Sequence, residues 1–172
     1  MRILVLGVGN PLLGDDSLGL HVARNVKEKI YGKNLKVKVD VEEISLDWLT
    51  IAEKMLGYDK VILVDTIIVD EEKLVGEIFK FNLEEDYEKY SYSPTLHNLN
   101  FPLAFKIVKK FSSEKMPEKI VVILVGIRKP EKFTEKLSLK IKNMIPKLVE
   151  IVLDEILNVD GVNGFGLFKG EK

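Results

Sequence analysis

The chain has 172 residues, which is enough for one domain with a full hydrophobic core. Its 26 basic and 27 acidic residues leave a net charge of −1, so no basic excess points to nucleic acid or to an anionic membrane. There is no cysteine, which excludes disulfides, thiolate metal sites and a cysteine nucleophile and is in keeping with a cytoplasmic protein. No segment is typical of a targeting signal, and the longest apolar stretch, residues 120–127, is too short to cross a membrane.

Apolar strands and amphipathic helices alternate along the chain. In the first half of the chain, the pattern predicts a buried strand at 2–8, a helix at 17–31, a half-buried strand at 36–41, a helix at 46–56 capped by Ser45, and an apolar strand at 61–64 that ends at Asp65. In the second half, it predicts an additional antiparallel strand at 76–81, a helix at 98–111 and an apolar strand at 120–125. The last predicted element is a long helix at 137–156 that is bent or preceded by a turn near Pro146. Apolar strands separated by helices are typical of a parallel sheet covered on both faces. We expect a three-layer α/β sandwich of the phosphorylase/hydrolase-like kind with a mainly parallel twisted sheet, formed by residues 1–157 as a single domain, and an irregular tail over 158–172.

The glycine-rich segment after the first strand is the most informative motif. It reads GVGNPLLGDDSLG over residues 7–19, between a predicted strand and a predicted helix. A dinucleotide-binding loop places pyrophosphate at the N-terminus of such a helix, but here Asp15 and Asp16 occupy that place and repel a phosphate. Paired carboxylates after a parallel strand are suited to binding a cation or to acid/base chemistry.

Two further polar residues are expected at the same edge of the sheet. Asp65 ends the third predicted strand, and His97 lies in a loop just before a predicted helix. Ligands of open parallel sheets bind beyond the carboxyl ends of the strands. We therefore expect the paired aspartates, Asp65 and His97 to meet at one place, close enough for one cation to touch three of them.

Each of these residues also has a purely structural interpretation. Asp15 or Asp16 can cap the first helix and oppose its dipole, Asp65 can be a turn residue, and His97 can begin a helix without binding anything. The second histidine, His21, lies on the apolar face of the first predicted helix, so we expect it to be a packed core or boundary residue.

The opening segment, residues 3–19, resembles the signature of the hydrogenase maturation endopeptidases, which remove a C-terminal extension from the large subunit of [NiFe] hydrogenases. The resemblance continues in the expected order almost to residue 156, through segments at 61–65, 76–78, 95–97, 125–127, 130–131 and 137–138. This motif is much more specific than an isolated glycine-rich loop. Two places differ from the family: residues 41–45 read VEEIS where glycine and threonine are common, and residues 66–68 read TII where a second aspartate is common.

The resemblance implies an endopeptidase whose catalytic and metal-contacting residues are Asp16, Asp65 and His97. It implies that the metal is nickel, the ion already installed in the hydrogenase large-subunit precursor that is the partner, although two carboxylates and an imidazole also suit another divalent cation. Three protein ligands leave positions for water or for a peptide carbonyl. The implied fold is a twisted sheet between helices, similar to that of the spore germination protease.

Two other functions stay open on the sequence alone. A nucleotide-binding module without protease activity would need phosphate contacts at the turn over residues 7–14 and an acid near Asp40 for a ribose. A hydrolase of the same fold that acts on a different peptide or metallocentre is the third possibility.

Overall fold

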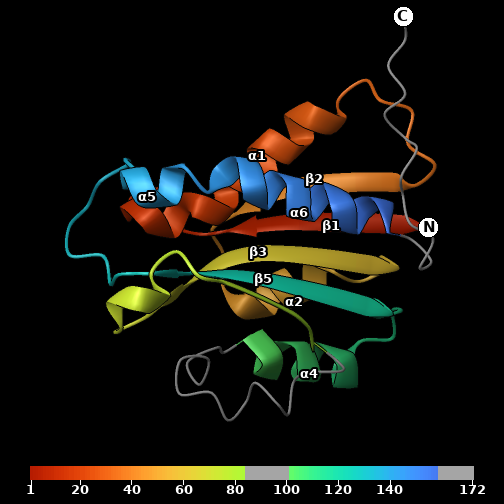
Figure 1. Ribbon diagram of the computed structural model, residues 1–172. Coiled ribbons are helices and arrows are strands. Elements are labelled where there is room, and N and C mark those ends of the chain that lie inside the picture. The colour runs from red at the N-terminus through yellow and green to blue at the C-terminus, as the bar shows by residue number, and fades with distance from the viewer. Residues whose placement is uncertain (84–100, 159–172) are drawn as a thin grey trace, which may run out of the picture.

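The central sheet is sandwiched between helices, and the apolar runs of the sequence form its inner strands (Figure 1). The computed structural model describes residues 1–83 and 101–158. The strands are β1 (Arg2–Val8), β2 (Lys38–Ile44), β3 (Lys60–Ile68), β4 (Ile78–Asn82) and β5 (Lys119–Ile127). The helices are α1 (Leu18–Ile30), α2 (Trp48–Lys54), α4 (Phe101–Phe111), α5 (Leu139–Lys142) and α6 (Ile145–Leu157), with short 3-10 turns η1 (Gly14–Ser17) and η2 (Glu72–Leu74).

The strands form one sheet in the order β2-β1-β3-β5-β4. Strands β2, β1, β3 and β5 run parallel, whereas β4 pairs antiparallel with β5, as the pattern at residues 76–81 predicts. Helices α1 and α6 lie on one face of the sheet, and α2 and α4 lie on the other (Figure 1). The predicted three-layer α/β sandwich with a mainly parallel sheet is therefore confirmed.

Two hydrophobic cores fill the spaces between these layers. In β1, Leu4 and Leu6 belong to the core beneath α2 and α4, whereas Ile3 and Val5 belong to the core beneath α1 and α6. Successive side chains of a strand point to opposite faces of a sheet, so a strand that is apolar at every position needs cover on both sides. This is the physical reason why the unbroken apolar runs predict two helical layers.

One expected strand boundary is wrong in a way that matters for the site. Asp65 does not end the third strand but lies within β3, where it is paired with Leu124 of β5. Pairing of β3 with β1 stops at Val64, yet pairing with β5 continues to Ile68. The hydrogen bonds to β5 keep β3 extended after its other neighbour has turned away.

Two helix predictions are also corrected. Ser45 does not cap α2, because the cap is Asp47, whose Oδ1 accepts hydrogen bonds from the amides of Leu49 and Thr50 at 3.1 and 3.0 Å. The helix expected over residues 137–156, with a bend or a preceding turn near Pro146, is two helices, α5 and α6, and the break between them lies just before Pro146. Pro146 lies in the first turn of α6, where its missing N–H removes no helical hydrogen bond.

A buried ion pair holds the end of α6 against the start of β3. Lys60 is 1% exposed, and its Nζ lies 2.8 Å from Oε2 of Glu155 and 2.5 Å from the Glu155 carbonyl oxygen. The other carboxylate oxygen of Glu155 lies 2.5 Å from Nζ of Lys80. Burial lowers the pKa of Lys60 against the opposing effect of Glu155. Burial also disfavours the charged form of Glu155, but the two lysines outweigh this and lower its pKa.

The described ranges contain no helix with both the length and the apolar character that crossing a membrane requires.

Candidate active site

The order of the strands changes direction at the boundary between β1 and β3. From β1 the chain passes through α1 to β2 on one side, whereas β3 lies on the other side of β1. In an open α/β sheet the connections leave the two strands in opposite directions at such a point, and a crevice opens beyond their carboxyl ends. The loop of residues 9–17, called the site loop below, follows β1 into this place.

Glycines allow the site loop and α1 to press against the strands. A Cβ atom on Gly9 would lie 2.1 Å from the carbonyl oxygen of Asp16, and one on Gly19 would lie 2.2 Å from the carbonyl oxygen of Val8 and 2.4 Å from that of Val64. A side chain at Gly9 would therefore force the two ends of the site loop apart, and one at Gly19 would push α1 away from the sheet. The glycine pattern of the opening motif is explained by this close packing.

Asp16 is held by two hydrogen bonds, one to each carboxylate oxygen. Its Oδ1 accepts from the hydroxyl of Thr66 in β3 at 2.9 Å, and its Oδ2 accepts from the backbone amide of Asn10 at 3.0 Å. The side chain is partly buried and connects β3 with the first residues after β1. Both oxygens keep lone pairs with which to accept from a ligand.

Asp65 is a buried carboxylate, 7% exposed. Burial raises its pKa well above the usual value, and the negative charge of Asp16 raises it further, while the Thr66 amide acts in the opposite direction. None of the charges that act on Asp65 within the described part of the chain is positive. The structure therefore brings Asp16 and Asp65 within electrostatic reach of each other.

Because β3 is pleated, the side chains of Asp65 and Thr66 point to opposite faces of the sheet. Asp65 alternates with Leu63 and Ile67, which belong to the core beneath α2 and α4. Thr66 alternates with Val64, which belongs to the core beneath α1 and α6. Thr66 can therefore reach the loop that leads into α1, while Asp65 faces the layer that contains α4.

Asp15 has a different partner from its neighbour. Its Oδ1 accepts a hydrogen bond of 2.6 Å from the backbone amide of Ser138, and the Ser138 hydroxyl in turn accepts from the amide of Ile141 in α5. Neither Asp15 nor Asp16 donates or accepts a capping bond at the start of α1, so the capping interpretation is wrong for both.

The segment after β5, residues 128–138, runs beside the site loop and is called the strap below. The Gly14 amide donates to the Thr134 carbonyl at 2.7 Å, and the Thr134 amide donates to the Leu12 carbonyl at 2.9 Å. Leu13 and Thr134 thus form an isolated parallel bridge. Together with the bond between Asp15 and Ser138, these contacts fix the strap against the site loop.

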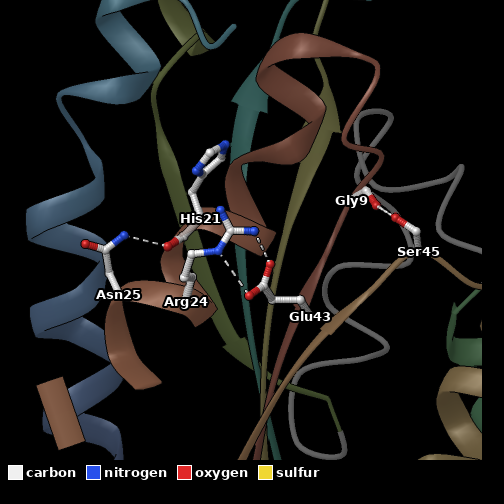
Figure 2. A network of polar contacts seen from close by, with 6 residues as sticks. All are labelled: Gly9, His21, Arg24, Asn25, Glu43 and Ser45. Atoms are coloured by element: carbon white, nitrogen blue, oxygen red, sulfur yellow. Dashed lines mark hydrogen bonds and ion pairs between the residues drawn. The ribbon is translucent and has the colours of Figure 1, made fainter. Parts of the chain in front are cut away.

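The far side of the site loop is tied to β2. The hydroxyl of Ser45 donates to the carbonyl of Gly9 (Figure 2). The Gly9 amide donates to the carbonyl of Ile44 at 3.2 Å. Arg24 of α1 makes a two-pronged ion pair with Glu43 of β2, with nitrogen–oxygen distances of 3.2 and 2.6 Å (Figure 2). These contacts hold the end of β2, the site loop and α1 as one unit.

The two histidines differ in what the structure shows of them. His21 is half-buried on α1, as expected of a boundary residue, and burial followed by the charge of Arg24 lowers its pKa (Figure 2). His97 lies outside the described residues. Within the described ranges no three aspartate, glutamate or histidine side chains are close enough to bind one ion.

The nucleotide-binding alternative receives no support from β2. Asp40, the acid that a ribose would need, is paired with Leu4 in the first half of the strand, away from the carboxyl edge. Its carboxylate accepts a hydrogen bond from the hydroxyl of Tyr58 at 3.0 Å and lies 3.6 Å from Arg2.

Sequence reasoning missed three contributors to this site: Thr66, Ser45 and the strap. A hydroxyl directly after the strand aspartate was a usable signal for Thr66, since polar residues at the end of a buried strand are unusual. The family resemblance includes residues 130–131 and 137–138 of the strap, but no pattern predicts its contacts with the site loop, because most of them use backbone atoms.

Comparison with known proteins identifies the class. Residues 20–155 match the family model described as hydrogenase maturation protease. A Methanocaldococcus jannaschii relative assigned to the same proteases is 31% identical over 163 residues, covering 90% of this chain and 96% of its own. The HybD hydrogenase maturating endopeptidase of E. coli superposes with a TM-score of 0.64 at 26% identity, covering 91% of this chain and 92% of that one. The [NiFe] hydrogenase maturation protease HybD of Thermococcus kodakarensis does so with a TM-score of 0.61 at 27% identity, covering 91% and 99%.

The chain belongs to the hydrogenase maturation proteases. It is a hydrolase, an endopeptidase with the sheet and helical layers of the HybD proteins.

Proposed function

We propose that this enzyme removes the C-terminal extension of a [NiFe] hydrogenase large-subunit precursor, and that Asp16, Asp65 and His97 bind the nickel of the loaded precursor during cleavage. Residues 1–157 act as the peptidase domain. The nickel belongs to the substrate, so the enzyme uses it to recognise a precursor whose metal insertion is complete.

The observation that supports the proposal most strongly is the buried carboxylate of Asp65 beside the partly buried carboxylate of Asp16. Asp65 is 7% exposed with a raised pKa, and the charge of Asp16 adds to the cost of ionising it. A structural role would place a lysine, an arginine or several amide donors beside a buried aspartate. A divalent cation brought by the substrate would supply the missing positive charge and favour the ionised form of Asp65.

The position of α4 supports the assignment of His97 as the third member. His97 precedes α4 by four residues in the sequence. Helix α4 packs on the face to which Asp65 points, through Phe105 in the same hydrophobic core. In the proposed site, His97 comes to Asp65 from the segment before this helix and adds a nitrogen ligand to two oxygen ligands, a set that suits nickel.

The described residues have separate tasks in this scheme. Asp16 is fixed by Thr66 and Asn10, so it offers a carboxylate whose direction is set before the substrate arrives. Asp65 holds a proton more readily than an exposed aspartate, because its pKa is raised, so it can take part in proton transfer. Bound nickel would polarise the scissile carbonyl or a water molecule.

A cleavage assay with two forms of the precursor tests the proposal. The purified enzyme is incubated with nickel-loaded and with nickel-free large-subunit precursor, and loss of the C-terminal segment is followed by mass spectrometry. We expect cleavage of the loaded form only. Equal cleavage of both forms would contradict recognition through nickel.

The residue assignment is tested in the same assay. Asp16→Asn and Asp65→Asn remove one negative charge each from the site, and we expect neither variant to cleave the loaded precursor. Asp154→Asn, an exposed change on α6, is the matched control and should cleave at the wild-type rate. If Asp16→Asn or Asp65→Asn cleaves as fast as the control, the substituted residue is not part of the active site.

A further inference from the structure

A cleft of about 850 Å³ lies directly beside the site loop. One wall is formed by residues 13–15 of the site loop, the other by the strap, and Val69 and Asp70 after β3 also line it. Asp16 follows Asp15 of the first wall, and Val69 follows the end of β3, the strand that contains Asp65 and Thr66. Both segments therefore place the cleft next to the candidate active site in the chain.

The walls of the cleft are fixed before any ligand binds. The bridge between Leu13 and Thr134 and the bond from Ser138 to Asp15 join the two walls. At Gly14, which has a φ of 56°, a Cβ atom would lie 3.0 Å from Thr134, so the walls are in contact there. On the outer side, Arg128 is bound to Glu72. The strap is thus a supported wall without regular secondary structure.

The charges of the strap favour an anionic ligand. Lys129, Lys132 and Lys136 line the cleft, are exposed, and form no ion pair within the part of the chain that the structure describes. Glu131 is the one acidic side chain of the strap that lines the cleft, whereas Asp15 and Asp70 line it from outside the strap. The wall formed by the strap therefore carries more positive than negative charge.

The size of the cleft limits what can occupy it. A volume of this size falls within the range of roughly 300–1,000 Å³ typical of pockets for small ligands, so a short extended peptide fits and a folded domain does not. A C-terminal extension ends, by its chemistry, in a free carboxylate. The body of the precursor would stay outside while this short segment enters.

We propose that the cleft binds the C-terminal extension of the precursor and that the strap lysines Lys129, Lys132 and Lys136 pair with its carboxylates, including the terminal one. This inference rests on the function proposed above, and it assigns to the strap the role of holding the part of the substrate that is released. Asp15 acts here as a positioning residue, because it fixes the strap rather than contacting the nickel.

Charge reversal on the strap tests the inference. For the double variant Lys132→Glu/Lys136→Glu, we expect KM for the loaded precursor to rise about tenfold with kcat within about twofold of wild type, since each exposed ion pair contributes modestly and reversal replaces attraction by repulsion. The control is Lys29→Glu/Lys147→Glu, which makes the same change in net charge on α1 and α6. Equal KM values for the two double variants would overturn the inference.

A binding measurement separates this inference from the proposed function. Two synthetic peptides copy the extension, one with a free C-terminal carboxylate and one with a C-terminal amide, and fluorescence anisotropy gives their Kd values. The wild type should bind the free acid severalfold more tightly than the amide, and the strap variant should bind both equally weakly. Wild-type Kd values that do not differ would overturn the role of the strap lysines, whether or not the precursor is cleaved. Tight binding without cleavage of the loaded precursor would instead contradict the proposed function alone.

Discussion

The hydroxyl of Thr66 donates a hydrogen bond of 2.9 Å to Oδ1 of Asp16, and this bond joins the site loop to β3. The neighbouring side chain on the strand, Asp65, points to the opposite face, so one strand supports the first carboxylate and supplies the second. The distance between the two carboxylates is thereby set by the pleat of β3 and by a single side-chain contact.

Removing this hydroxyl should loosen Asp16. We expect Thr66→Val to lower kcat for the loaded precursor about tenfold or more, because a hydrogen bond to a charged group contributes roughly 1.5–3 kcal/mol. Thr66→Ser keeps the hydroxyl and should retain most of the activity. Steady-state kinetics of the two variants check this, and a Thr66→Val enzyme with wild-type kcat would show that Asp16 needs no support from β3.

The stability of the enzyme without substrate should depend on pH through Asp65. The pKa of Asp65 is higher in the folded state than in the unfolded state, where it is about 4. Between these two pKa values the folded state binds more protons than the unfolded state. The free energy of unfolding therefore falls as the pH rises through this range. Asp65→Asn removes this penalty. We therefore expect the variant to melt at a higher temperature than wild type at pH 8 and at nearly the same temperature at pH 4. A gain that is equal at both pH values would contradict the ionisation argument.

The two histidines should respond in opposite ways to substitution. We expect His97→Ala to abolish cleavage while the melting temperature is unchanged. His21→Ala should retain activity and lose about 1 kcal/mol of stability, as is usual for a partly buried residue. Thermal melts and the cleavage assay on both variants decide this, and an inactive His21→Ala enzyme would reverse the assignment.

A methyl group at Gly9 should disturb the site more than the fold. The added Cβ would lie 2.1 Å from the carbonyl of Asp16, so the site loop must move, and we expect Gly9→Ala to lower kcat by at least tenfold with a loss of about 1–3 kcal/mol in stability. Gly32 is the control, since it has a φ of 71° and nothing within 4 Å of an added Cβ. Gly32→Ala should lose about 1 kcal/mol from backbone strain and keep full activity. Equal activity losses would point to a general effect of glycine replacement.

The buried ion pair predicts a double-mutant result. Glu155→Ala leaves Lys60 charged and buried with only backbone carbonyl partners, which should cost about 3–5 kcal/mol. The combination Lys60→Met/Glu155→Leu removes both charges and should recover most of that loss. Urea denaturation of the single and double variants measures it, and additive losses would show that the two residues do not depend on each other.

Most of the fold could be predicted because β1, β3 and β5 are apolar at nearly every position, and such strands need helices on both faces. The order of the strands in the sheet could not be predicted, because the periodicity of apolar residues shows which face of a strand is buried but not which other strand pairs with it. The position of Asp65 within β3 was missed for the same reason: only the pairing with β5, through residues such as Leu124, keeps the strand extended there.

The active site could be predicted only in part from the sequence. Adjacent residues such as Asp15 and Asp16 look equivalent in the sequence, and the structure separates them by partner: Ser138 for one, Thr66 and Asn10 for the other. These partners lie as far as 123 positions away, and no local pattern encodes contacts over such a separation.

The bond between Asp15 and Ser138 also has a consequence for the time at which the enzyme becomes competent. A chain is made from its N-terminus, so the carboxylates of the site loop are synthesised long before the strap that supports them. Until Ser138 and the strand before it have left the ribosome, β3 lacks its neighbour β5 and the site loop lacks its second wall. An incomplete chain therefore cannot form the finished site, and the protease should become active only after nearly the whole domain has been made and folded.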